Sequence, residues 1–511
     1  MKESTSLILT ITTKPKWYIL KTGAFLCLIL FCSKTFAATA PSKELPSPYL
    51  RPILFSVANI FRNNMVLQRE KPIVIWGKAL RGDRIQVRAS WVKRDFFANA
   101  DSANTWKVII PASPANNIPQ TVTFTDTTVK KVIKITNILI GDVWLCAGQS
   151  NMAMPIAKSP PSFDGVINYE NEIAAANDSL IHFTTVDALI STKELDTLVQ
   201  PAKWQICTSA TSPFMSAVAY YFGKSLTSAL NVPIGLIIAA ANGSFCESWI
   251  SPNRYDNSLL LKRGHLEFKS LFYNGMINPW LTYPIKGVIW YQGESNKKNS
   301  PDQFFNFTKT LILDWRTLFR DEKLPFYFVQ LAPFDEKQTN NSLLNDYAKI
   351  REAQAALLTL PNTGMAVTMD VGEVHNQHPR NKKPVGERLS LIALNKTYHK
   401  RSYDFCGPQF KSFTVRDSII IIKFKGGTAN HLQTINNQPL KQFFAIEGSD
   451  CRFVPAQAQI YGDKIRLTIL AKVPRPIQAI RYAFTNFPVT NIQNGSGLPM
   501  EPFRSDNYWD Q

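Results

Sequence analysis

One serine stands where a nucleophile can act. Ser150 follows the apolar run 141–147 and lies between Gly148-Gln149 and Asn151. A serine hydrolase needs a hydroxyl, a base that takes its proton, and donors for the oxyanion that forms. A serine directly after a strand begins the next helix, where its backbone N–H is free to face an oxyanion. The same position suits an N-cap serine, so placement alone leaves both roles open.

The base must come from six histidines. His375 and His378 fall in a loop after the predicted strand 365–370, and Pro379 disfavours helix at His378. The residues alone leave both of these histidines as candidates. The other four lie in segments with no other catalytic feature: His182, His265, His399 and His431.

Two further loops can supply donors to an oxyanion. Gly243 follows the apolar run 234–240, and because it lacks a Cβ its backbone N–H can approach a substrate closely. Gln292 and Asn296 follow the run 285–291, and each can offer a side-chain amide.

Acidic residues beside these loops suggest a second chemistry. A glycosidase uses a pair of carboxylates, and Glu247 and Glu294 are available for such a pair. In that reaction Glu294, and not Ser150, is essential. In an esterase, Glu294 is instead expected to contact substrate or to orient a neighbouring loop.

The elements that must position these residues are predicted by five apolar runs. The runs end in polar loops and alternate with helical stretches such as 216–230 and 345–358. This alternation predicts a parallel sheet covered by helices on both faces, with ligands bound at the carboxyl ends of the strands. The resulting α/β domain spans residues 139–400, and its strands are 141–147, 234–240, 285–291, 325–330 and 365–370.

The flanking segments are predicted to be β-rich. Short β-branched runs between turn residues predict a small β-sandwich over residues 51–138. Residues 401–511 return to strands. The predicted strands are 72–77, 84–88, 106–110 and 129–135 in the first segment, and 419–424, 464–469 and 479–484 in the second.

The first 37 residues have the order of a secretory signal. Lysines precede the apolar run 23–31, and small residues near Ala37 suit cleavage. The run is shorter than the roughly 20 residues of a stable membrane span. We therefore expect a secreted or periplasmic protein that begins near Ala38, continues through a linker at 38–50 and keeps no membrane span. An uncleaved anchor is the alternative.

Composition narrows the classes of partner. Hydrophobic residues make up 45% of the chain and charged residues 19%, as in ordinary soluble globular proteins. The formal net charge of +19 favours acidic partners such as sialylated or uronic glycans. The basic residues are dispersed, with no long run, which argues against nucleic acid. No CxxC or Cys/His spacing points to a metal site.

Three blocks of the sequence resemble those of the sialate O-acetylesterases, a branch of the SGNH (GDSL-like) hydrolases. Residues 148–152 resemble the nucleophile block, and residues 290–296 resemble the third block. Residues 378–382 and 385–389 resemble the histidine block. Similar matches at residues 64–69, 76–77, 481–484 and 497–506 extend the resemblance over nearly the whole mature chain.

The resemblance implies an SGNH-hydrolase three-layer α/β/α domain and a serine esterase that removes acetyl groups from carbohydrates. It makes Ser150 the nucleophile and His378 the base, with Gly243 and the Gln292/Asn296 loop as oxyanion donors. It implies neither a metal nor an organic cofactor. O-acetylated sialic acid is the first substrate expected, and acetylxylan or another acetylated glycan is the second. A non-catalytic glycan-binding protein is the alternative of another class.

Two departures from the family pattern leave the acidic member of the triad open. The family commonly has an aspartate two residues before the histidine, where this chain has Asn376. Its second block usually carries paired glycines, where this chain has Asn242-Gly243. Glu373 is our first candidate for the residue that orients the base. Asp370 or a backbone carbonyl can also hold the imidazole.

Overall fold

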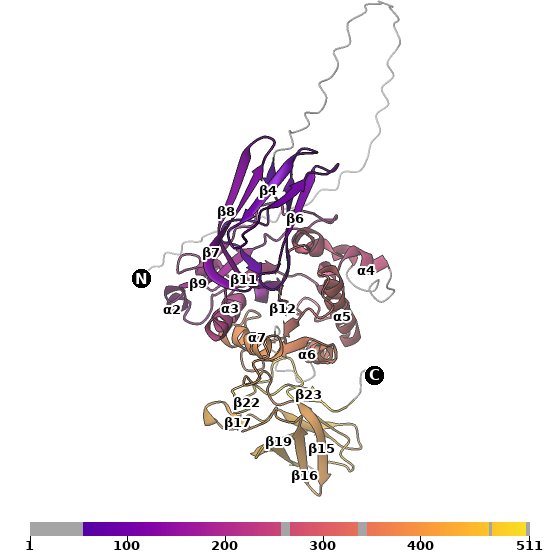
Figure 1. The fold of residues 1–511 in the computed structure, drawn as a ribbon. Helices are drawn as coiled ribbons and strands as arrows, with labels where there is room; N and C mark the ends of the chain where they lie inside the picture. Colours follow the sequence, from indigo (N-terminus) through magenta and orange to yellow (C-terminus); the bar gives the residue numbers. More distant parts are fainter. Residues whose placement is uncertain (1–54, 257–265, 336–344, 470–472, 507–511) are drawn as a thin grey trace, which may run out of the picture. The chain divides into compact units, whose positions relative to one another are not determined.

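The computed structural model describes residues 55–256, 266–335, 345–469 and 473–506 (Figure 1). The predicted signal, cleavage site and linker lie outside these ranges. Within them, we find no helix with the length and apolar character that crossing a bilayer requires.

The central sheet confirms the predicted α/β fold. Its main path runs in the order β10-β9-β11-β8-β12-β13-β14, and the neighbours from β9 to β14 pair in parallel. Almost every residue of β11, β12, β13 and β14 is buried, because helices cover both faces. The bounds are β8 Lys131–Gly148, β9 Asp178–Thr185, β10 Gln205–Cys207, β11 Ile234–Ala240, β12 Gly287–Tyr291, β13 Phe326–Val329 and β14 Thr363–Ala366.

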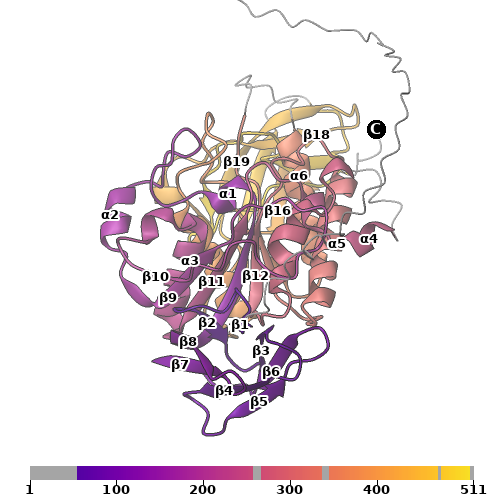
Figure 2. The ribbon, with the colours of Figure 1, turned by 90° about the horizontal axis from the view of Figure 1, so that it is seen from above.

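Helices form the outer two layers of this region (Figure 2). Helices α3 (Ala217–Leu230) and α7 (Lys383–Lys396) pack against each other on one side, and α5 (Pro301–Leu318) and α6 (Asp346–Ala356) do so on the other. N-terminal capping side chains fix where two of these helices begin. The Ser216 side chain caps α3, and Ser300 forms a capping box that starts α5. The predicted helices 216–230 and 345–358 thus correspond to α3 and α6.

Strand β8 belongs to two regions at once. Its residues 131–140 pair with β7 (Asn116–Asp126) in antiparallel fashion, and residues 142–148 pair in parallel with β11 and β12. One continuous backbone therefore leads from the N-terminal β-region to the residues that precede Ser150.

The flanking regions are β-rich, as predicted, and apart from the parallel pairing of β2 with β8 their strands are antiparallel. In the N-terminal region, one sheet has the order β1-β3-β6, and β2, β4, β5 and β7 join the larger sheet through β8. The bounds are β1 Ser56–Val57, β2 Val66–Gln68, β3 Ile73–Lys78, β4 Arg84–Ala89, β5 Phe96–Asn99 and β6 Thr105–Ile110.

The C-terminal region has a seven-stranded sheet in the order β15-β16-β20-β19-β18-β21-β23, and β17 and β22 form a separate two-stranded sheet. Alternating burial along β16 and β19 is typical of a sheet with one covered face. The bounds are β15 Phe410–Arg416, β16 Ile419–Phe424, β17 Gln433–Thr434, β18 Phe444–Glu447, β19 Phe453–Tyr461, β20 Lys464–Ile469, β21 Ala479–Tyr482, β22 Ile492–Gln493 and β23 Phe503–Arg504.

One predicted strand is displaced. We expected a strand over 365–370, but β14 covers Thr363–Ala366. Its register is set by the pairing of Thr363 with Phe326 of β13. The last four residues of the predicted strand instead begin the loop that carries His378, so this loop is longer than the sequence pattern indicated.

Candidate active site

Ser150 lies at the carboxyl end of β8 as the first residue of the short helix α1 (Ser150–Ala153). Its side chain is buried against the protein, and its backbone N–H has no acceptor within its own helix. Gly148 makes the approach to this point possible. At its φ of +143° a Cβ would stand 2.1 Å from the carbonyl oxygen of Tyr291, so only glycine fits.

The structure brings His378, and not His375, to the serine. His378 Nε2 lies 2.8 Å from Ser150 Oγ. The His378 backbone N–H donates to Asn376 Oδ1 at 2.9 Å, and the Phe163 ring meets the imidazole edge-on with centroids 5.0 Å apart. His375 is exposed in the same loop. The geometry therefore favours His378 over His375 as the candidate base.

The backbone of Ser162 lies beside the His378 ring and favours the charged imidazolium, which raises the pKa of His378. Burial and the positive charge of Lys382 act in the opposite direction and lower the pKa of His378 to about 4.

Neither acidic candidate orients the imidazole. The Asp370 carboxylate forms a two-point pair with Arg388, at 2.7 and 2.6 Å. Glu373 accepts from the Arg380 backbone N–H at 2.6 Å and from Asn376 Nδ2 at 3.3 Å. No hydrogen bond joins Glu373, the predicted acidic member, to the imidazole in the structure, and its carboxylate instead braces the loop that holds His378.

The side-chain amides of Gln292 and Asn296 are fully buried, and the hydrogens of both amide nitrogens are donated to protein. Gln292 Nε2 donates to the Ser244 carbonyl at 3.2 Å and to Asn296 Oδ1 at 2.6 Å. Asn296 Nδ2 donates to Glu247 Oε2 at 2.8 Å and to Asn299 Oδ1 at 3.3 Å. An amide nitrogen carries two hydrogens, so neither has one left for an oxyanion. Their predicted role changes from donors to braces of the loop after β11.

Glu294 and Glu247 do not form the open carboxylate pair of a glycosidase. Glu294 is 4% exposed and Glu247 is 1% exposed. Glu294 accepts from Asn151 Nδ2, and Glu247 accepts from Asn296. Burial raises the pKa of Glu294. The predicted contact of Glu294 with substrate is therefore replaced by a contact with the residue that follows Ser150.

Gly243 keeps its predicted place. The Ala241 N–H donates to the Gly148 carbonyl at 3.0 Å, and Ala240 pairs with Gly148 in the sheet. The turn that follows is thereby anchored at the edge where Ser150 lies. Gly243 is exposed there with a φ of +70°, and among the described residues no atom would come within 4 Å of a Cβ at this position.

Three contacting residues were missed by reasoning from the sequence. Asn151 and Lys382 lie inside the blocks that carry the family resemblance, so a signal was present, but it did not reveal that they bond to each other. Ser162 belongs to no block. Its contact with His378 joins segments more than 200 residues apart in the sequence, and only the tertiary fold brings them together.

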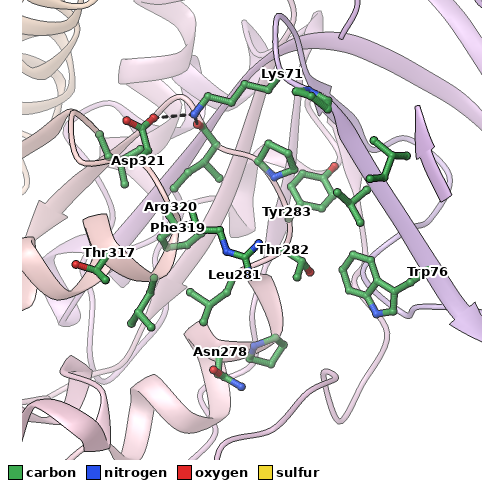
Figure 3. A pocket seen from close by; sticks show the side chains of 18 of the residues that line it. Lys71, Trp76, Asn278, Leu281, Thr282, Tyr283, Thr317, Phe319, Arg320 and Asp321 are labelled. Atoms are coloured by element: carbon green, nitrogen blue, oxygen red, sulfur yellow. Dashed lines mark hydrogen bonds and ion pairs between the residues drawn. The ribbon is translucent and has the colours of Figure 1, made fainter. Parts of the chain in front are cut away.

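A separate cleft of about 960 Å³ lies away from these residues (Figure 3). Its lining includes residues that precede β12 and β13, such as Ile285 and Leu324, so it opens at the amino ends of the strands. Lys71 pairs there with Asp321 at 2.8 Å. Ligands of parallel sheets bind at the opposite edge, where Ser150 and His378 meet.

Comparisons with known proteins identify the family of the chain. The family described as carbohydrate esterase, sialic acid-specific acetylesterase (SASA) matches residues 140–394. The sialate O-acetylesterase of Mus musculus is 28% identical over 519 residues, which cover 88% of this chain and 94% of the relative. The Homo sapiens enzyme is 28% identical over 498 residues, which cover 88% and 92%.

A solved structure resembles nearly the whole chain. A carbohydrate acetylesterase from Xanthomonas citri is 31% identical, with a TM-score of 0.79, and the match covers 89% of this chain and all of the other. The family match contains the nucleophile, third and histidine blocks, and the structural match adds both flanking β-regions. The chain is thus a carbohydrate acetylesterase that belongs to the sialic acid-specific acetylesterase family.

Proposed function

We propose that Ser150 is the nucleophile that removes acetyl groups from a carbohydrate and that His378 is its base. The observation that carries this proposal is the 2.8 Å contact between Ser150 Oγ and His378 Nε2 at the carboxyl edge of the sheet. We assign the Ser162 carbonyl as the acceptor of the Nδ1 hydrogen, because the Ser162 backbone favours the protonated ring. This tautomer leaves Nε2 free to accept a proton.

The reaction proceeds in two halves. His378 Nε2 takes the hydroxyl proton while Ser150 Oγ attacks the acetyl carbonyl carbon. The resulting imidazolium returns the proton to the sugar oxygen as the C–O ester bond breaks, which leaves an acetyl-enzyme. A water molecule, deprotonated by His378, then attacks the acetyl group. Acetate leaves, and Ser150 Oγ recovers its proton.

The oxyanion of each half is assigned to backbone donors. The Ser150 N–H begins α1 without a helical acceptor, and the exposed Gly243 N–H lies on the adjacent loop. Preorganised donors of this kind are worth about 10²–10³ in kcat each. A backbone carbonyl in place of a carboxylate makes this a Ser–His dyad, in which the Ser162 oxygen orients the ring.

For the substrate we propose an O-acetylated sialic acid. The mammalian relatives are named sialate O-acetylesterases, and the family description carries the same specificity. Sialic acid is anionic, and this chain has 57 lysine and arginine residues against 38 acidic ones. Such a balance favours approach of an acidic glycan.

Acetate release from matched substrates tests the assignment. We expect the purified enzyme to release acetate from O-acetylated sialic acids with a higher kcat/KM than from acetylated xylo-oligosaccharides, and Ser150→Ala to release none from either. If the enzyme turns over only the xylo-oligosaccharides, the assignment of sialic acid as substrate is wrong and the assignment of Ser150 as nucleophile still stands. Full turnover by folded Ser150→Ala would reject the nucleophile itself.

We also propose that the protein is exported with cleavage near Ala38. The order of lysines, apolar run and small residues before this point supports the proposal. N-terminal sequencing of protein recovered from the medium or the periplasm is expected to begin at or near Ala38. Exported protein that retains Met1 would refute cleavage.

A further inference from the structure

A buried lysine lies beside the serine–histidine pair and takes no part in the proton transfers described above. Lys382 follows His378 by four residues and is 1% exposed. Its ammonium donates to Asn151 Oδ1 and lies 5.3 Å from the centroid of the Tyr291 ring. Burying an ammonium is costly unless it is paired and hydrogen-bonded, so its partners decide what it does.

The Asn151 side chain joins the nucleophile segment to the base segment. Asn151 directly follows Ser150, and its Nδ2 donates to the carbonyl of Gln377 at 3.1 Å. Gln377 directly precedes His378. The same Nδ2 donates to Glu294 Oε1. An ammonium can only donate, and a carbonyl can only accept, so these partners fix which way the amide points.

The groups around the ammonium come from two parts of the chain: the end of β12 with the loop that follows it, and the histidine loop. Glu294 after β12 and Glu373 in the histidine loop both raise the pKa of Lys382, but burial outweighs them and lowers it to about 7. Tyr291 at the end of β12 presents its ring, and His378 lies on the same loop as Glu373. The positive charge of Lys382 opposes a second positive charge on the imidazole.

We infer that Lys382 is a positioning residue of the esterase: its hydrogen bond to Asn151 places a buried positive charge beside the pair, where it opposes a second positive charge on the imidazole, and through Asn151 it holds the ring against Ser150. The inference rests on the proposed roles of Ser150 and His378. It adds a buried side-chain network of Lys382, Asn151 and Glu294. This network affects the reaction only by positioning Ser150 and His378.

The pH profile of kcat/KM tests whether the charge of Lys382 acts on His378. The base must be neutral, so activity is lost on the acid side as His378 becomes protonated. Without the Lys382 charge, protonation occurs at higher pH. We expect Lys382→Met and Lys382→Gln each to move the acid limb upward by about one pH unit. The exposed neighbour Lys383 provides the matched control, and Lys383→Met should leave the limb where it is.

The two substitutions separate charge from hydrogen bonding. Gln at position 382 can still donate to Asn151 Oδ1, whereas Met cannot. Both variants should show the shifted limb, and Lys382→Met should show the lower kcat. A folded Lys382→Gln protein with an unmoved limb would overturn the inference, because a merely structural lysine predicts that result.

Asn151→Ala tests the clamp independently of the lysine variants. It removes the link to the Gln377 carbonyl and leaves the ammonium in place. We expect kcat to fall about ten- to a hundredfold through misplacement of the pair, with the acid limb unmoved. An unchanged kcat would overturn the clamp even if neither Lys382 variant folds. Ser150→Ala distinguishes the failures: if that variant is active, the proposed function fails, and otherwise only the present inference does.

Discussion

Two loops at the same edge of the central sheet carry similar polar residues and use them differently. The loop after β8 leaves the Ser150 hydroxyl 2.8 Å from His378 Nε2. The loop after β12 places Gln292 and Asn296 in full burial, with every amide hydrogen donated to protein. The type of a polar residue therefore does not tell whether it is catalytic or structural. What separates the two roles is the partner of each polar group, a histidine base for the Ser150 hydroxyl and supporting protein groups for the two amides, and the fold decides that partner.

The largest expected effect tests the first loop. Ser150→Ala removes the attacking oxygen and leaves the backbone unchanged, so kcat for acetate release should fall by about a thousandfold or more with little change in melting temperature. Steady-state kinetics and thermal unfolding of the same preparation measure both. Residual turnover near the wild-type level would place the chemistry elsewhere.

The two histidines of one loop give the next effect. His378→Ala removes the proton acceptor and should be almost as inactive as Ser150→Ala, because members of a serine–histidine unit act together. His375→Ala is the matched control, since it changes an exposed side chain of the same loop, and it should keep most activity. The reverse pattern in these two variants would transfer the role of base to His375.

The second loop should respond mainly in stability. Gln292→Ala leaves the Ser244 carbonyl without its side-chain donor, and the free energy of unfolding should fall by about 1–3 kcal/mol. Denaturant unfolding measures this loss, and Asn299→Ala, which removes one 3.3 Å bond, is the control. A stable Gln292→Ala protein whose kcat falls a hundredfold would restore Gln292 as an oxyanion donor.

A smaller effect is expected at Glu373. Glu373→Gln keeps an acceptor for the Arg380 N–H and removes only the negative charge, so kcat should fall less than tenfold. Removal of the charge from a true acidic member of a triad costs about 10⁴ in kcat. A loss of that size in Glu373→Gln, seen in steady-state kinetics, would return Glu373 to the triad.

The smallest effect is that of mild acid on the wild-type enzyme. With a His378 pKa of about 4, most of the base stays neutral at pH 5, and kcat/KM should change less than about twofold between pH 7 and pH 5. A histidine with the ordinary value of about 6.5 would lose about thirtyfold over this range. A profile that declines from pH 6.5 would show that burial and Lys382 do not act on this ring.

Much of the fold was predictable because its signals are local. Apolar runs that end in polar loops predicted β8, β11 and β12, and the helical stretch 216–230 predicted α3. The end of β14 was misplaced because its length depends on pairing with β13, which no local pattern reveals.

The site was predictable to a different degree for each residue. Ser150 and His378 could be named from their blocks, and the structure brings them together. The partner of the imidazole could not be named, since any residue has a backbone carbonyl and Ser162 reaches the ring only through tertiary structure. The braces Gln292 and Asn296 were misjudged because sequence does not report which hydrogens are already donated.

Strand β8 has a consequence for how the chain unfolds and how it can be divided. Its first half is held by β7 and its second half by β11 and β12, so the N-terminal β-region and the central sheet share 18 residues of one backbone. Melting of the two regions is therefore expected as a single cooperative transition. A fragment that begins at residue 139 would keep Ser150 but would lose the part of β8 that pairs with β7. The smallest independently folding unit that contains Ser150 must also include the β-region before it.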